Sequence, residues 1–491
     1  MKRAAVMLII ALAGALPGEA EVHEVSTCAD LNALAAEGAA QPGDEIVIED
    51  GEWLDAAIDL NCSGREDAPI TVRPQTPGGL TLTGASSIRI AGSHVVVSGI
   101  QMRGGMRAVA ADGVEREQRR APIDIHGDHC RVTECAIIDY NPVGRETRYM
   151  WVVIRGVGNR VDHCYFRGQD HSGVTMTVNV ARARPNEARI DHNYFAGKPP
   201  LGANGGETIR IGTSHVSVYN SRTTVENNLF EHCDGEGEII SNKSCENVYR
   251  RNTFRECAGE LTLRHGDRCI VEGNVFLCND YSGSRGVRLV GRDHHVINNY
   301  VYDPDRYGVA LQAGIVDTPL SGYVQVERAL VAFNTIVAPH GDCIRLVSVE
   351  TEGMLPAIRS IFANNILLGP GRTIIARAPN PDDFTWAGNI AWGGELGISE
   401  REGITWADPM LVEAEDGLLR PSEDSPAIGA AAGTYDYDNP TELSWLLANI
   451  TRDIDGQSRD EQPDIGCDEL SEEPIAWRPL TSADVGPTWM R

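Results

Sequence analysis

The chain lacks three features that would place it in common classes of protein. After residue 20 no stretch approaches about 18 consecutive apolar residues, so we predict no membrane-spanning helix. A basic excess is also missing, because 43 Lys and Arg residues stand against 70 Asp and Glu residues and the net charge is −27. This balance argues against a nucleic-acid partner, which requires a basic surface. The 12 cysteines include no Cys-x-x-Cys pair, which argues against a zinc ribbon or a thioredoxin-type site.

The start of the chain has the pattern of a secretory signal peptide. Lys2 and Arg3 make it positive, and the apolar run from Val6 to Leu16 is too short to span a membrane. The alternative is a buried N-terminal helix. We predict that residues 1–20 are a signal peptide and that the protein is secreted or periplasmic, where disulfides can form.

A short motif recurs along the middle of the chain, in which an Asn precedes a small cluster of apolar residues. The successive steps are 35, 24, 22, 25, 35, 31 and 24 residues. A base period near 22–25 with longer insertions is typical of a solenoid. The asparagines are Asn193, Asn228, Asn252, Asn274, Asn299, Asn334, Asn365 and Asn389.

The repeated units favour strands over helices. They are short and rich in Val, Ile, Thr and Phe, and Gly, Asn and Asp separate them. Asn residues stacked at one turn can form a hydrogen-bonded ladder, and Asn tolerates left-handed backbone geometry there. We predict an all-β fold, a right-handed parallel β-helix over residues 21–400 with three strands per coil. The handedness follows the general rule for parallel crossovers.

Both ends of a solenoid must be covered. Residues 26–40 read as a capped, Ala-rich helix that covers the N-terminal end. Beyond about residue 400 the repeat fades and the chain becomes rich in Pro and acidic residues. We predict that residues 401–491 form a C-terminal cap and tail rather than a second catalytic domain.

Three Gly-Glu dipeptides end at Glu207, Glu238 and Glu260, with steps of 31 and 22 residues. If each begins a strand on a successive coil, the three carboxylates stack and repel unless a proton or a cation lies among them. Glu236 shares a face with Glu238, and Asn204 comes just before Glu207. Oxygen donors of this kind suit Ca²⁺. The alternatives are an exposed acidic edge and the paired carboxylates of a glycosidase.

Two basic residues accompany this acidic column. Lys243 and Arg264 are 21 residues apart, which is again about one coil. Alone, Lys243 would most often be a solvated surface residue and Arg264 would pair with an acid such as Asp267. Together beside the acids, they predict chemistry on an anionic substrate. His265 could position that substrate or act as a base, and its alternative is a turn His bonded to Asp267.

Several segments carry a resemblance to a known family. They read Gln41-Pro-Gly-Asp-Glu-Ile-Val-Ile, Glu236-Gly-Glu-Ile-Ile-Ser-Asn-Lys243-Ser, Glu246-Asn-Val-Tyr-Arg-Arg-Asn-Thr-Phe and Leu263-Arg-His-Gly-Asp267. Together they resemble polysaccharide lyase family 6, which contains alginate lyases and enzymes of the chondroitinase B type. The resemblance covers roughly residues 25–400.

The resemblance implies a parallel β-helix with a polysaccharide site on it. It implies Lys243 as the base, Arg264 as the partner acid, and Ca²⁺ held by Glu236 and Glu238. The run that contains Asn204 and Glu207 is similar to that of the alginate-cleaving members. Charge stabilisation is the safer physical role for an Arg, because its guanidinium does not give up a proton readily.

This chemistry is the β-elimination of a uronate. The C5 proton can be removed only when the adjacent carboxylate is neutralised, which a bound cation does. Arg210 could neutralise the carboxylate instead, and His265, Arg210 and Arg288 are our substrate-binding candidates. We predict a lyase acting on an anionic polysaccharide, most typically alginate.

Other functions stay open at this point. A chondroitin or dermatan sulfate lyase would need further Arg residues for sulfate, and Arg285, Arg288 and Arg345 could serve. Two alternatives of another class are a β-helix glycoside hydrolase and a non-catalytic carbohydrate-binding surface protein.

Overall fold

The computed structural model describes residues 20–105, 121–142, 144–202, 204–347, 352–377, 383–432 and 451–491. Apart from residue 20, the predicted signal peptide lies outside the described residues. Within the described part of the chain, no helix is both long enough and apolar enough to cross a membrane.

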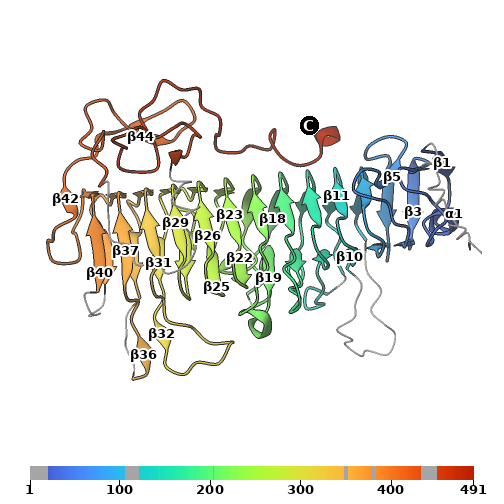
Figure 1. The fold of residues 1–491 in the computed structure, drawn as a ribbon, viewed down its shortest axis with the longest axis horizontal. Helices are drawn as coiled ribbons and strands as arrows, with labels where there is room; N and C mark the ends of the chain where they lie inside the picture. The colour runs from blue at the N-terminus through green and yellow to red at the C-terminus, as the bar shows by residue number, and fades with distance from the viewer. Residues whose placement is uncertain are drawn as a thin grey trace, which may run out of the picture.

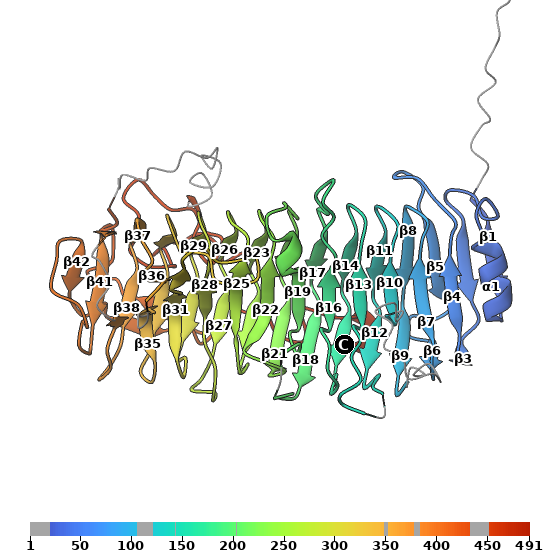
Figure 2. The same ribbon diagram turned by 90° about the horizontal axis from the view of Figure 1, so that it is seen from below.

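Three long parallel sheets run the length of the molecule (Figures 1 and 2). The first 14-stranded sheet contains β1 (Val22–Val25), β2 (Glu45–Ile48), β5 (Ile70–Pro74), β8 (Val95–Ser98), β11 (Arg131–Thr133), β14 (Arg160–Asp162), β17 (Arg189–Asp191), β20 (Thr224–Glu226), β23 (Val248–Arg250), β26 (Ile270–Glu272), β29 (His295–Ile297), β33 (Leu330–Ala332), β37 (Ser360–Ala363) and β40 (Phe384–Ala387). The second 14-stranded sheet contains β3 (Gly51–Leu54), β6 (Leu80–Thr83), β9 (Ile100–Arg103), β12 (Ala136–Ile138), β15 (Tyr165–Arg167), β18 (Tyr194–Lys198), β21 (Leu229–Cys233), β24 (Thr253–Arg255), β27 (Val275–Leu277), β30 (Tyr300–Tyr302), β34 (Thr335–Val337), β38 (Ile366–Leu368), β41 (Asn389–Trp392) and β42 (Ile404–Trp406).

The third sheet has 12 strands and carries most of the residues discussed below. It contains β4 (Ala57–Leu60), β7 (Ser87–Ile90), β10 (Ile123–Ile125), β13 (Val152–Ile154), β16 (Met176–Val178), β19 (Ile209–Gly212), β22 (Glu238–Lys243), β25 (Glu260–His265), β28 (Val287–Leu289), β31 (Tyr307–Leu311), β35 (Asp342–Leu346) and β39 (Ile375–Arg377). Apart from the coils at the two ends, each coil contributes one strand to each sheet, so the predicted parallel β-helix is confirmed.

The recurring asparagines form a continuous ladder between the first and second sheets. The backbone N–H and the side-chain amide of Asn228 both donate to Oδ1 of Asn252, at 3.1 and 3.0 Å. The same pair of bonds links each ladder asparagine to the next, from Asn193 to Asn389. All eight side chains are buried. The predicted stacking on successive coils is therefore confirmed.

The ladder asparagines themselves do not have the left-handed backbone conformation that the sequence pattern suggested. The residue before each ladder asparagine has positive φ, for example Asn227 at 52° and Arg251 at 52°. The ladder asparagine itself is thereby free to turn its side chain inward. Two residues after the ladder position of each coil, Phe rings stack in the core at centroid separations of 4.5–5.1 Å, from Phe166 to Phe276.

The N-terminal end is covered by a helix, but a shorter one than residues 26–40. Helix α1 spans Cys28–Leu34, and the Thr27 side chain caps it by accepting the Asp30 N–H. The helix ends there because the Ala35 carbonyl accepts the N–H groups of Asn61 and Cys62, each at 2.8 Å. All 12 cysteines are free thiols, and all except Cys28 are buried.

The C-terminal segment returns along the outside of the solenoid. After the antiparallel pair β43 (Leu411–Glu413) and β44 (Leu419–Pro421), it runs back toward the N-terminal end, opposite the small antiparallel pair β32 (Gly314–Ile315) and β36 (Met354–Leu355) (Figure 1). The indole N–H of Trp489 donates to the Glu134 carbonyl at 2.8 Å.

We expect Asn274→Ala to destabilise the solenoid, because it leaves buried donors and acceptors on both neighbouring coils without partners. Each unsatisfied group costs about 1–3 kcal/mol. Chemical denaturation followed by circular dichroism measures the loss. The exposed Asn61 gives the matched control, because Asn61→Ala should change stability by no more than about 0.5 kcal/mol. Equal stability of the two variants would contradict a structural role for the ladder.

Candidate active site

The candidate residues gather on the outward face of the 12-stranded sheet. Alternation along each strand sends Ile240 and Leu263 into the core and turns Ser241 and Thr262 outward. Arg210, Ser241, Thr262 and Arg288 occupy one register position on four consecutive coils. Residues one coil apart in sequence are therefore neighbours in space.

Two register shifts between β22 and β25 modify this simple stacking. One lies between Glu238 and Ile240, and the other lies after Asn242, so that Lys243 pairs with His265 rather than with Arg264. A bulge sets two residues against one on the partner strand. As a result both Arg264 and His265 lie beside Lys243.

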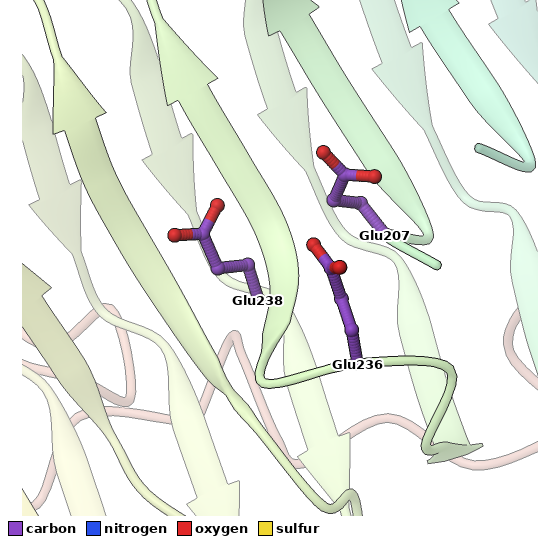
Figure 3. Close-up of side chains that lie close together, drawn as sticks. All are labelled: Glu207, Glu236 and Glu238. Atoms are coloured by element: carbon purple, nitrogen blue, oxygen red, sulfur yellow. The ribbon is translucent and has the colours of Figure 1, made fainter. Parts of the chain in front are cut away.

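Three glutamates converge at the start of this strand pair. One carboxylate oxygen from each of Glu207, Glu236 and Glu238 lies within 4.8 Å of the others, and the three side chains lie close together (Figure 3). Oε2 of Glu207 is buried without a hydrogen-bond partner. Burial and the negative charge of Glu207 raise the pKa of Glu236. We call these residues the glutamate triad, and its hard oxygen donors fit a metal ion.

Two basic side chains approach the buried member of the triad. Lys243 Nζ lies 3.6 Å from Glu207 Oε1, and Arg210 Nη1 lies 3.9 Å from the same oxygen. The Lys243 side chain is 17% exposed, so it is reachable from solvent while lying against the triad.

Two further arginines approach the other end of the triad. Arg288 Nη2 lies 2.8 Å from Glu238 Oε1, and Arg264 Nε lies 3.7 Å from it. The ring of Tyr323 covers the Arg264 guanidinium, whose carbon lies 4.0 Å from the ring centroid. The structure thus brings together the four predicted basic residues Arg210, Lys243, Arg264 and Arg288.

Glu260 is in register with Glu238 but does not belong to the glutamate triad. It pairs with Glu238 as its position in the repeat indicated. Its carboxylate instead forms an ion pair with Arg288 Nε at 2.7 Å and is hydrogen-bonded by Tyr307. Glu260 therefore lies outside the triad and helps to hold Arg288.

His265 is a buried neutral side chain. Its Nε2 lies 3.1 Å from Ser214 Oγ, in the short helix η1 (Ser214–Val216), and 3.3 Å from Arg264 Nη1. Burial, followed by the charges of Arg264 and Lys243, lowers the pKa of His265 to about 3. This favours a positioning role over a base, and Asp267 instead accepts the N–H of Arg292.

Asn204 lies at the edge of this arrangement. It is exposed in the loop before β19, and the next residue, Gly205, donates its N–H to Glu236 at 2.8 Å. Of the arginines considered for sulfate, Arg285 lies 3.4 Å from Glu260, whereas Arg345 pairs with Asp342 at 2.6 Å.

Sequence reasoning missed two residues at the site. Tyr323 comes from an insertion about 60 residues after Arg264, and no pattern marked it. Lys198 lies behind the triad with its ammonium 3.0 Å from the Glu207 carbonyl, and burial lowers its pKa to about 7. The scarcity of lysine in this chain could have pointed to Lys198.

Comparison with known proteins identifies the family. A family model described as Chondroitinase B matches residues 27–434. The chain belongs to this family, polysaccharide lyase family 6. No curated protein matches the chain.

Solved structures of family 6 lyases are similar to this chain. The alginate lyase AlyGC is 30% identical with a TM-score of 0.78, over 95% of this chain and 58% of AlyGC. A mannuronic acid specific family 6 lyase from human gut microbiota is 30% identical with a TM-score of 0.72, over 79% of this chain and 91% of that one. A family 6 lyase from Pseudopedobacter saltans is 25% identical with a TM-score of 0.67, over 95% and 99%. This chain thus matches little more than half the length of AlyGC.

We expect His265 to stay neutral throughout the physiological pH range. Its ring resonances in ¹H–¹⁵N spectra should not shift between pH 8 and pH 5, and His265→Gln assigns them. Folding lowers the pKa of His265, so only the unfolded state takes up a proton when the pH falls below the ordinary His pKa of about 6.5. The contribution of His265 to the stability of the fold is therefore complete above this pH and declines below it. A midpoint near neutral pH would contradict this description.

Proposed function

We propose that this protein is an alginate lyase that cleaves its substrate by β-elimination with Lys243 as the base. The observation that carries the proposal is the position of the Lys243 ammonium, 3.6 Å from the glutamate triad on an accessible face. A base beside a cation site is the arrangement that this reaction needs.

The local charge of the site favours an anionic polymer despite the net charge of −27. Arg210, Lys243, Arg264 and Arg288 line the face on which the triad lies. Such a basic cluster attracts a polyanion to one place on an otherwise acidic surface. A cation bound at the triad would add to this attraction.

Two of the three arginines considered for sulfate are engaged away from the triad. Arg285 lies against Glu260, and Arg345 pairs with Asp342 while its guanidinium stacks 4.9 Å from the Tyr307 ring. This favours a uronate without sulfate over chondroitin or dermatan sulfate. The names of the similar solved structures agree with alginate as the substrate.

The triad fits Ca²⁺, which Glu207, Glu236 and Glu238 would hold with Asn204 at the rim. When bound, the ion supplies the positive charge that makes the proton next to a uronate carboxylate removable. Mg²⁺ fits less well, because it demands tight octahedral geometry and retains its waters.

The side chains around the triad have separate roles in the proposed reaction. Lys243 in its neutral form accepts the C5 proton. Arg264, held flat by Tyr323 and beside His265, stabilises the charge on the departing 4-O-linked sugar, and Arg210 and Arg288 orient the neighbouring uronate. A glycoside hydrolase would instead use one carboxylic acid and one carboxylate, which leaves Lys243 and Arg264 without a role.

Replacing the base tests this function directly. On alginate the wild-type protein should generate the ultraviolet absorbance of an unsaturated uronate, and Lys243→Ala should lower kcat by about 10²–10⁴-fold because it removes the proton acceptor. Arg345→Ala, further along the same sheet, should retain activity. Dermatan sulfate serves as the competing polymer, and reducing ends without this absorbance would indicate a hydrolase.

Removing the metal tests the triad. Activity should fall in excess EDTA and return with Ca²⁺ but poorly with Mg²⁺. Glu236→Gln should raise the Ca²⁺ concentration needed about tenfold or more, because it removes one charge without releasing Lys243 or Arg288. Glu260→Gln is the matched control, whose carboxylate lies outside the triad and should leave the Ca²⁺ requirement unchanged. Full activity in EDTA, with no metal detected by elemental analysis, would assign charge neutralisation to the arginines.

A further inference from the structure

Lysine is rare in this chain. Of the 43 Lys and Arg residues only Lys2, Lys198 and Lys243 are lysines, and Lys2 lies outside the described residues. The other two meet at one residue from opposite sides. Lys243 Nζ lies 3.6 Å from the Glu207 carboxylate, and Lys198 Nζ lies 3.0 Å from the Glu207 carbonyl.

Lys198 is the last residue of β18, and its side chain is directed into the solenoid. It is 3% exposed. Its ammonium donates to Gln169 Oε1 at 2.7 Å, Gly173 O at 2.9 Å and Thr175 Oγ1 at 3.2 Å, in addition to the Glu207 carbonyl. All four acceptors are uncharged, and they come from two successive coils.

An arginine could not replace this lysine. The residual space beside the ammonium is about 10 Å³, which is at the lower limit for a single water molecule and too small for a planar guanidinium. A compact ammonium can reach four oxygens around one point, whereas a guanidinium spreads its donors in a plane. The position therefore suits a lysine, although nearly all other basic residues of this chain are arginines.

The stem of Lys198 also contacts the next coil. A Cβ placed on Gly235 would lie 2.7 Å from Lys198 Cε and 2.2 Å from the Gly206 carbonyl. Gly206 and Gly235 therefore pack backbone against backbone, with the lysine stem beside them. These glycines directly precede Glu207 and Glu236, so one side chain supports both turns.

We propose that Lys198 is a positioning residue for the cation site: by fixing the backbone of Glu207 and the turn before Glu236, it makes their carboxylates converge. This inference rests on the proposed function in that the triad binds Ca²⁺. A purely electrostatic effect of Lys198 would weaken Ca²⁺ binding rather than strengthen it, because an ammonium near the triad repels a cation. The proposed role rests on the four hydrogen bonds, and the direction of the change in Ca²⁺ affinity separates it from this electrostatic effect.

Lys198→Met tests this inference, because Met keeps the length of the stem and removes the donors. Isothermal titration calorimetry with CaCl₂ alone should show an affinity about tenfold or more weaker than that of the wild type. At saturating Ca²⁺ the kcat on alginate should return to near the wild-type value. Unchanged or tighter Ca²⁺ binding by Lys198→Met would overturn the inference.

Three controls separate positioning from simple destabilisation. Thr175→Val removes one acceptor while the lysine remains, so its Ca²⁺ affinity should fall between those of the wild type and Lys198→Met. If Lys198→Met does not fold, Thr175→Val and Gln169→Leu decide the matter, and wild-type affinity in both overturns the inference. Asn365→Ala, in the distant ladder, should lower the Tm without changing Ca²⁺ affinity. Absence of Ca²⁺ binding by the wild type would instead reject the calcium part of the proposed function, and this inference with it.

Discussion

The register between successive coils is the constraint on which the rest of this structure depends. Buried asparagine side chains maintain it, because each one after the first accepts two hydrogen bonds from the coil before, and the inner ones donate to the coil after. Because the coils are fixed in this way, equivalent residues of neighbouring repeats lie one strand spacing apart. The insertions between repeats can then vary in length without disturbing the alignment.

The candidate active site exploits this register and departs from it locally. Glu207 and Glu238 come from neighbouring coils, and the bulges in β22 and β25 bring Arg264 and His265 opposite Lys243. The resulting charges nearly balance one another. The acids hold the basic side chains at the surface of the sheet, and the basic side chains limit the repulsion among the acids. A site of this kind agrees with the proposed function, in which a cation and a polyanion bind together.

The support beneath the site is as specific as the site itself. Tyr323 covers Arg264 from outside, and Lys198 ties the backbone of Glu207 from inside. Glu260 illustrates the same principle, since its position in the repeat matches that of Glu238 but its partners Arg288 and Tyr307 give it another role. Identical placement in the repeat thus does not give identical chemistry, because the partners come from other coils.

The sequence by itself determined the solenoid, since a 22–25-residue period of Asn and apolar clusters can bury its core only by stacking. It also determined which residues approach one another, because the candidate residues either lie about one coil apart in the sequence or lie on the same coil. These residues are Glu207, Glu236, Glu238, Lys243 and Arg264. Only the tertiary structure decided the register shifts, the exclusion of Glu260 from the triad, the neutral state of His265, and the places of Lys198 and Tyr323. These depend on contacts across coils and insertions of unequal length, which a linear spacing does not specify.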